Sequence, residues 1–90
     1  MVREIVRVLG KSRALDILLA LSEKDYSFRE LVKKVGGSTV TVQKRVEELK
    51  KLGLIQDRKL NKFPFTRTIS ITKKGKNIVE ILKSIEGREL

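Results

Sequence analysis

The sequence predicts a mainly α fold with one small β-hairpin, an α+β arrangement in the order helix, helix, helix, helix, hairpin, helix. Apolar residues recur with helical spacing over residues 2–52 and again over residues 73–86. Between these stretches, residues 65–72 change to the two-residue alternation of a strand with one buried face. A chain of 90 residues is long enough for one small domain, which we expect to cover residues 1–90.

The first two helices are predicted from apolar spacing. Residues 2–9 carry apolar side chains at positions i, i+3, i+4 and i+7, namely Val2, Ile5, Val6 and Leu9. Gly10 interrupts this helix, and Ser12 is expected to cap a second one that runs to about Ser22. The second helix has almost no polar face, so we expect it to lie at the centre of the core.

The third and fourth helices have clear boundary signals. Ser27 and Glu30 form a capping box, in which each side chain accepts a hydrogen bond from a free backbone N–H of the first turn. Gly36-Gly37 ends that helix, and Ser38 caps the next one, which runs to about residue 52. Two helices joined by a short glycine-containing turn form a helix-turn-helix.

A hairpin and a last helix complete the chain. We expect the hairpin to cover about residues 55–72, with residues 54–59 as the antiparallel partner of the alternating strand. The intervening Asn61–Pro64 is rich in turn-forming residues. Thr72 is expected to cap a helix over residues 73–86.

Composition restricts the possible partners. There are 21 lysines and arginines against 11 acidic residues, so the net charge is +10 and a polyanion, nucleic acid before membrane, is the expected partner. A lysine-rich solubilising surface is the alternative. Histidine and cysteine are absent, which excludes the usual zinc sites and thiol or imidazole nucleophiles. We expect no metal, no cofactor, no membrane span and no enzymatic activity, and a cytoplasmic protein with a thermophile-like composition.

The outward face of the fourth helix is the candidate base-reading surface. Its apolar stripe of Val42, Val46 and Leu49 would pack inward, which leaves the opposite side of its first turns facing out. Glutamine can pair with adenine, lysine with guanine, and an apolar methyl group can contact the thymine methyl. An ordinary solvated helix face is the alternative. The candidate DNA-binding residues of this helix are Ser38, Thr39, Val40, Thr41, Gln43 and Lys44.

Basic residues cluster around the hairpin. From Arg58 to Val79 there is no acidic residue, and like charges this close repel one another unless a phosphate backbone lies nearby. Lys73 and Lys74 also fall in the first turn of a helix, where the helix dipole disfavours cations by roughly 0.3–1 kcal/mol each. Screened surface lysines are the alternative. The candidate DNA-binding residues of the hairpin and its flank are Arg58, Lys59, Lys62, Arg67, Lys73 and Lys74.

Residues 38–49, the junction at residues 52–55 and the segment 69–75 together resemble ArsR- and MarR-like winged-helix repressors. The resemblance covers about residues 12–85. It implies a winged helix-turn-helix regulator that represses transcription by binding double-stranded DNA. The helix over residues 38–52 would lie in the major groove, and the hairpin would be a wing on the backbone or minor groove. Metal sensors of the ArsR type use cysteine or histidine ligands, which this chain lacks.

The terminal helices predict a homodimer, because they carry more apolar surface than one small core readily covers. The candidate interface residues are Ile5, Leu9, Ile78, Ile81, Leu82 and Ile85. Packing of both helices on their own domain is the alternative. For the function as a whole, the alternative is a winged-helix module that docks protein or RNA within a transcription or replication assembly.

Overall fold

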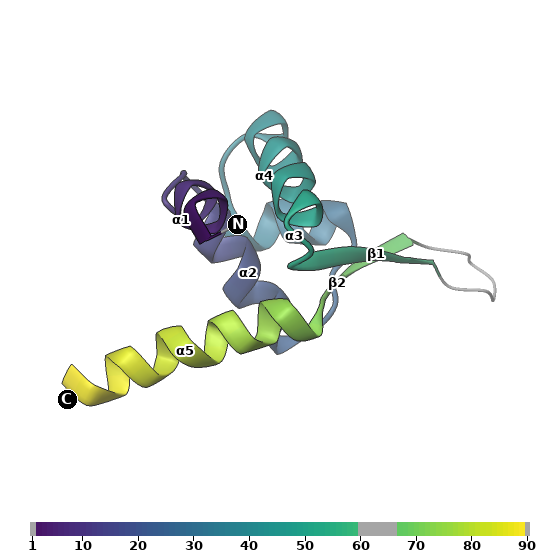
Figure 1. Cartoon of the computed structure of the whole chain (residues 1–90). Coiled ribbons are helices and arrows are strands. Elements are labelled where there is room, and N and C mark those ends of the chain that lie inside the picture. Colours follow the sequence, from purple (N-terminus) through teal and green to yellow (C-terminus); the bar gives the residue numbers. More distant parts are fainter. Residues whose placement is uncertain (1, 60–66, 90) are drawn as a thin grey trace.

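The computed structural model describes residues 2–59 and 67–89, which form five helices and one antiparallel hairpin (Figure 1). This element order confirms the predicted α+β class. The expected turn at residues 61–64 lies outside the described residues. The elements are α1 (Val2–Leu9), α2 (Ala14–Glu23), α3 (Phe28–Val35), α4 (Thr39–Lys51), β1 (Ile55–Lys59), β2 (Arg67–Ile71) and α5 (Lys73–Glu89).

Helix α1 has the predicted bounds but buries a different face. Val8, which the predicted stripe omitted, is 2% exposed, and Ile5 and Leu9 pack partly against the core. Val2 and Val6 are 74% and 65% exposed. The reason is that the i, i+3, i+4 set that begins at Ile5 faces the other helices, which leaves the first apolar positions outside.

The prediction that Ser12 caps α2 is wrong. The helix begins at Ala14, and its N-cap residue is Arg13, which adopts the left-handed conformation with φ 70°. A tight turn precedes it, in which the Ala14 N–H donates to the Lys11 carbonyl at 3.3 Å. This turn places Ser12 one residue too early to cap the helix.

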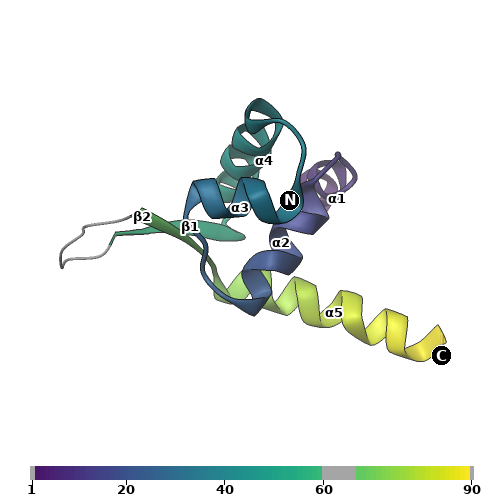
Figure 2. The ribbon, with the colours of Figure 1, turned by 180° about the vertical axis from the view of Figure 1, so that it is seen from behind.

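Helix α2 lies at the centre of the fold, as predicted. Its side chains Ile17, Leu18 and Leu21 are almost fully buried. It packs against α1, α3, α4, α5 and β2. Figure 2 shows α2 between α3 and α5.

The helix-turn-helix forms as its boundary signals predict. Ser27 and Glu30 make both hydrogen bonds of the capping box, and Gly36 ends α3 with φ 75°. The Ser38 side chain accepts from the Thr41 N–H and caps α4. Val42, Val46 and Leu49 of α4 are buried, which confirms the predicted inward stripe.

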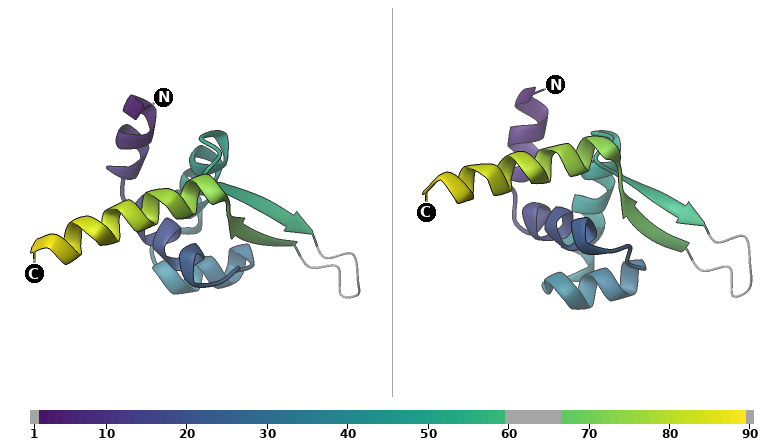
Figure 3. Two further views of the ribbon diagram at one scale, coloured as in Figure 1. Left: turned by 60° about the horizontal axis from the view of Figure 1, so that its bottom comes forward. Right: turned by 90° about the horizontal axis from the view of Figure 1, so that it is seen from below.

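The hairpin and α5 extend from the helical body towards opposite ends (Figure 3). The two strands pair in the register Ile55 to Ile71, so that Ile55, Ile69 and Ile71 enter the core. Thr72 caps α5 by accepting from the Gly75 N–H at 3.2 Å. The first part of α5 packs on α2, and its carboxyl-terminal part projects beyond the body.

Candidate nucleic-acid interface

The outward face of α4 presents four of the six predicted residues. Thr39, Val40, Gln43 and Lys44 are all exposed. Val40 is 65% exposed although it is a large apolar residue, and it lies on the side of α4 opposite the buried stripe. The face therefore combines a hydroxyl, a methyl surface, an amide and an ammonium group within two turns of one helix.

Ser38 and Thr41 mainly serve the start of this helix. The Ser38 hydroxyl accepts from the Thr41 N–H at 3.1 Å and donates to the Thr41 hydroxyl at 2.9 Å. Thr41 is also partly buried. These contacts fix the first turn of α4, so the two residues act as its cap and hold the neighbouring Thr39 and Val40 outward.

Gln43 makes a contact along the outward face. Its side-chain amide donates to Glu47 at 3.1 Å, one helical turn further on. Both groups are exposed, so the bond is open to exchange with water or another polar partner. The adenine pairing predicted for Gln43 requires this amide to reorient.

The hairpin lies beside α4, and the ion pair between Lys50 and Asp57 joins the two. Lys50 contacts Asp57 of β1 at 2.8 Å and Glu47 at 3.5 Å. Arg58 pairs at 3.5 Å with Asp25, from the segment before α3, while its side chain remains 67% exposed. Lys59 and Arg67 are opposite one another in the strand register, and Lys62 lies outside the described residues.

The structure does not bring Lys73 and Lys74 next to the predicted DNA-binding residues of α4. They begin α5, beside the carboxyl-terminal end of α4, which is about 18 Å along the helix from Thr39. The sequence showed no structural role for Lys74. In the structure its ammonium group donates to the Leu52 carbonyl at 2.8 Å, just beyond α4. This bond explains a lysine in the first turn of α5, because it satisfies a carbonyl at the end of α4.

An apolar groove between α2 and α5 was not predicted from the sequence. It has a volume of about 470 Å³ and is lined by Leu15, Leu19, Ser22, Glu23, Leu82, Lys83 and Ile85. Leu15 and Leu19 are 38% and 39% exposed. The sequence contains a signal for this groove, because α2 is apolar on nearly all sides and a helix of that kind has more apolar surface than its own core covers.

The predicted interface residues of the terminal helices divide into two sets. Ile81 and Ile85 are 60% and 53% exposed, and Leu82 lines the groove. Ile5, Leu9 and Ile78 pack partly against the core of their own chain. The exposed apolar surface of the terminal helices is therefore carried mainly by Val2 and Val6 of α1 and by Ile81 and Ile85 of α5.

Two further properties follow from the described side chains. Within residues 2–58 and 68–85, no group of three acidic, histidine or cysteine side chains is arranged to hold a metal ion. In the part of the chain that the structure describes, every helix is too short or too polar to cross a bilayer.

A family model described as HxlR-like helix-turn-helix matches residues 8–87. No curated protein matches the sequence significantly. The family match covers both the helix-turn-helix and the hairpin.

Solved structures with the same fold include transcriptional regulators. The reduced form of YodB from B. subtilis has a TM-score of 0.86 and 19% identity, over 94% of this chain and 84% of that one. The transcriptional repressor BigR from Xylella fastidiosa has a TM-score of 0.79 and 21% identity, over 98% and 85% of the two chains. The homodimeric winged helix-turn-helix DNA-binding domain of Mb0332 from Mycobacterium bovis, a possible ArsR-family regulator, has a TM-score of 0.76 and 19% identity, over 98% and 79%. These likenesses identify the fold as a winged helix, and none of the three proteins is described as an enzyme.

Proposed function

The chain belongs to the HxlR-like helix-turn-helix family, and on that premise we propose that it regulates transcription by binding double-stranded DNA. Residues 1–90 would act as one winged-helix domain on cytoplasmic DNA, with α4 in the major groove and the hairpin on the backbone or minor groove. The observation that carries the proposal is the outward face of α4, where Thr39, Val40, Gln43 and Lys44 are exposed together.

The dimensions and chemistry of α4 suit the major groove. That groove is about 12 Å wide and admits one helix. The first turn of α4 contains no acidic residue, so no carboxylate there would repel a phosphate that approaches the N–H groups at the start of the helix. Gln43 can pair with adenine, Lys44 with guanine, and the Val40 methyl groups can contact a thymine methyl.

The charge distribution supports binding to the phosphate backbone. The chain carries a net charge of +10. Arg58, Lys59, Lys62 and Arg67 of the hairpin would contact phosphates, which adds affinity with little sequence information. Lys73 and Lys74 lie further from the outward face of α4, so the only role we assign to them is contact with phosphates that flank the bound site.

A homodimer would complete the interface. The groove beside Leu15, Leu19, Leu82 and Ile85 is apolar and open, and a second copy would bury it. Glu23 and Lys83 also line the groove and have opposite charges, so each can face its counterpart across a two-fold axis. The Mb0332 domain is a homodimer and BigR is a repressor, which supports assigning both properties to this chain.

The test is selection from a pool of random duplexes, in competition with bulk genomic DNA. We expect one enriched motif made of two inverted half-sites, spaced about one helical turn or 34 Å apart. The Gln43→Ala variant should bind this motif more weakly, by about 1–3 kcal/mol, and should lose preference at one base pair per half-site.

The matched control is Asn77→Ala, which removes an exposed side-chain amide from α5, away from the reading face. It should select the same motif with the same affinity as the unmodified protein. A pool that yields no enriched motif would refute sequence-dependent binding. A Gln43→Ala protein with the original motif and affinity would exclude Gln43 as a reader.

A further inference from the structure

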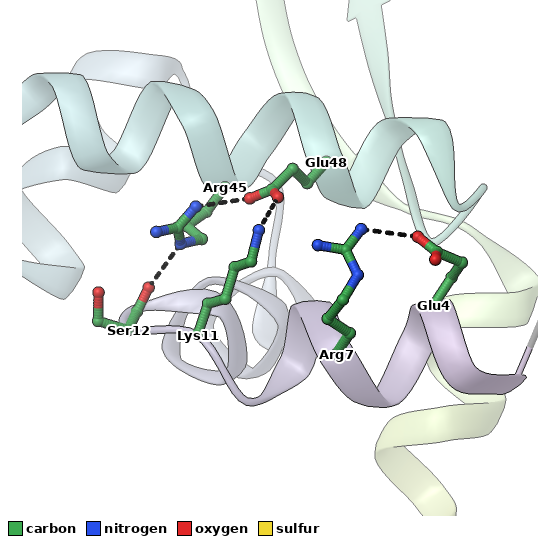
Figure 4. A network of polar contacts seen from close by, with 6 residues as sticks. All are labelled: Glu4, Arg7, Lys11, Ser12, Arg45 and Glu48. Atoms are coloured by element: carbon green, nitrogen blue, oxygen red, sulfur yellow. Dashed lines mark hydrogen bonds and ion pairs between the residues drawn. The ribbon is translucent and has the colours of Figure 1, made fainter.

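The turn between α1 and α2 makes polar contacts with the middle of α4 (Figure 4). The Lys11 ammonium group donates to one carboxylate oxygen of Glu48, and the Arg45 guanidinium group contacts the other at 2.5 Å. Arg45 also donates through Nε to the Ser12 carbonyl at 3.0 Å. Figure 4 shows these groups bridging the space between the turn and the α4 ribbon. We call Lys11, Arg45 and Glu48 the polar clamp.

The polar clamp is partly shielded from water. The side chains of Lys11, Arg45 and Glu48 are 31%, 17% and 26% exposed. The hydrogen bond from Lys11 is the main cause that lowers the pKa of the Glu48 carboxyl, and Arg45 lowers it further, whereas partial burial opposes them. Glu48 therefore holds a negative charge between two cations that come from different elements.

The same turn also contacts the end of α3 and the connection that leads into α4. Arg13 donates through Nη1 to the carbonyl of Val35, the last residue of α3, at 3.3 Å. A Cβ atom at Gly37 would lie 2.9 Å from the Arg13 Nε, so Arg13 packs closely over the α3–α4 connection. One short turn thus contacts both the middle of α4 and the connection that precedes this helix.

These contacts add a directional restraint to the apolar packing of α4. The side chains of Val42, Val46 and Leu49 are buried and select the face of α4 that points inward, but apolar contacts are non-directional and define the rotation of the helix less sharply than hydrogen bonds do. Charge-assisted hydrogen bonds on the flank of α4 are directional and oppose that rotation. Base readout needs side chains held within about 0.5 Å and 10–20° of the productive geometry.

We propose that Glu48 is a positioning residue, which through Lys11 and Arg45 sets the rotation of the recognition helix for DNA binding. This inference rests on the proposed function, since it assumes that α4 reads DNA. Glu48 acts through its bonds to Lys11 and Arg45 and would contact no base itself. Its effect on DNA binding therefore comes from the orientation of Gln43 and Lys44 on the adjoining face.

The test compares Glu48→Gln with Glu4→Gln. Glu4 pairs with Arg7 at 2.7 Å within α1, on an exposed surface, so this control breaks an ion pair that joins no two elements. Each substitution removes one negative charge, so the net charge of both variants rises by one, which by itself strengthens binding to DNA. We expect Glu4→Gln to bind the selected duplex at least as tightly as the unmodified protein, and Glu48→Gln to bind about three- to thirty-fold more weakly.

A second measurement reports the position of α4 relative to α1 in the absence of DNA. The chain has no cysteine, so spin labels can be attached at Arg3→Cys on α1 and Lys51→Cys on α4. We expect the distance distribution between the labels to broaden or shift with Glu48→Gln and to stay unchanged with Glu4→Gln. The double variant Lys11→Met with Glu48→Gln should show no greater change than Glu48→Gln alone, because both substitutions break the same contact.

The outcomes separate this inference from the proposed function. An unmodified protein that binds no duplex selectively would refute the proposed function, and the label distances alone would then decide whether Glu48 orients α4. An unchanged distance distribution in Glu48→Gln would overturn the inference, whatever the DNA result. Equal affinities of Glu48→Gln and Glu4→Gln for the selected duplex would overturn it as well.

Discussion

Tyr26 and Ile69 exchange both of their backbone hydrogen bonds. The Tyr26 N–H donates to the Ile69 carbonyl at 3.2 Å, and the Ile69 N–H donates to the Tyr26 carbonyl at 2.7 Å. Tyr26 directly precedes the capping box of α3, and Ile69 is the middle residue of β2. This pair ties the helix-turn-helix to the hairpin, so that the wing has a fixed base against α3.

The first prediction concerns Gly75, near the start of α5. A Cβ atom there would lie 2.3 Å from the Leu54 carbonyl oxygen and 2.7 Å from a side-chain carbon of Ile71. Gly75→Ala should therefore reduce the free energy of unfolding by about 1–3 kcal/mol, as measured in urea. Gly10→Ala is the control, because its new Cβ would come no nearer than 3.4 Å to the Val6 carbonyl oxygen. Equal stability of the two variants would contradict the close packing at Gly75.

The second prediction concerns the pH dependence of stability through Glu48. Lys11 and Arg45 lower the pKa of Glu48 in the folded state, so the unfolded state binds its proton more readily. The stabilisation is fully present above the unfolded pKa of about 4.3 and is lost as the pH falls through the lower folded pKa. The difference in unfolding free energy between the unmodified protein and Glu48→Gln should shrink from pH 7 towards pH 2. Thermal unfolding across this range measures it, and a constant difference would show that Glu48 is not responsible.

The third prediction concerns the charge of the wing. Replacing both Lys59 and Lys62 by alanine should weaken binding to the selected duplex and to random DNA by similar factors, because phosphate contacts carry little sequence information. The slope of log affinity against log salt should fall by roughly one unit for each phosphate that a lysine no longer neutralises. Arg3→Ala, on the exposed surface of α1, is the control and should leave the slope nearly unchanged. If the double variant keeps the original slope of log affinity against log salt, the two lysines do not contact phosphates and the wing has another role.

The fourth prediction concerns dimerisation. A glutamate in place of Ile85, which is 53% exposed, should disturb the folded chain little but should place a charge in the proposed interface. Sedimentation equilibrium should give about twice the chain mass of 10.3 kDa for the unmodified protein and the single-chain mass for Ile85→Glu. Specific DNA binding should be weaker for Ile85→Glu than for the unmodified protein. A 10.3 kDa species for the unmodified protein at tens of micromolar would refute the dimer and the paired half-sites.

Local signals in the sequence predicted the elements well. The capping box of Ser27 and Glu30, the stop at Gly36 and the cap at Ser38 each depend on residues within four positions of one another. The outward face of α4 also followed from helical periodicity alone. Where the residues that decide a helix boundary are close in sequence, the local sequence pattern is sufficient to predict that boundary.

Contacts between distant segments had no such signal. Lys11 and Glu48 are 37 residues apart, and neither periodicity nor composition distinguishes them from the other charged residues. The same holds for the pairing of Tyr26 with Ile69. Arg13, and not Ser12, is the N-cap residue of α2, because the tight turn after α1 decides where the helix starts. These features depend on how the helices pack, which apolar periodicity predicts only as buried faces.

The most direct test of the central claim is to titrate the ¹⁵N-labelled protein with the selected duplex and follow its backbone amide resonances. If α4 and the wing bind DNA, the largest shifts should fall on residues 38–44 and on the two strands, and the carboxyl-terminal part of α5 should change little. Shifts confined to the groove between α2 and α5, with residues 38–44 unmoved, would contradict the account.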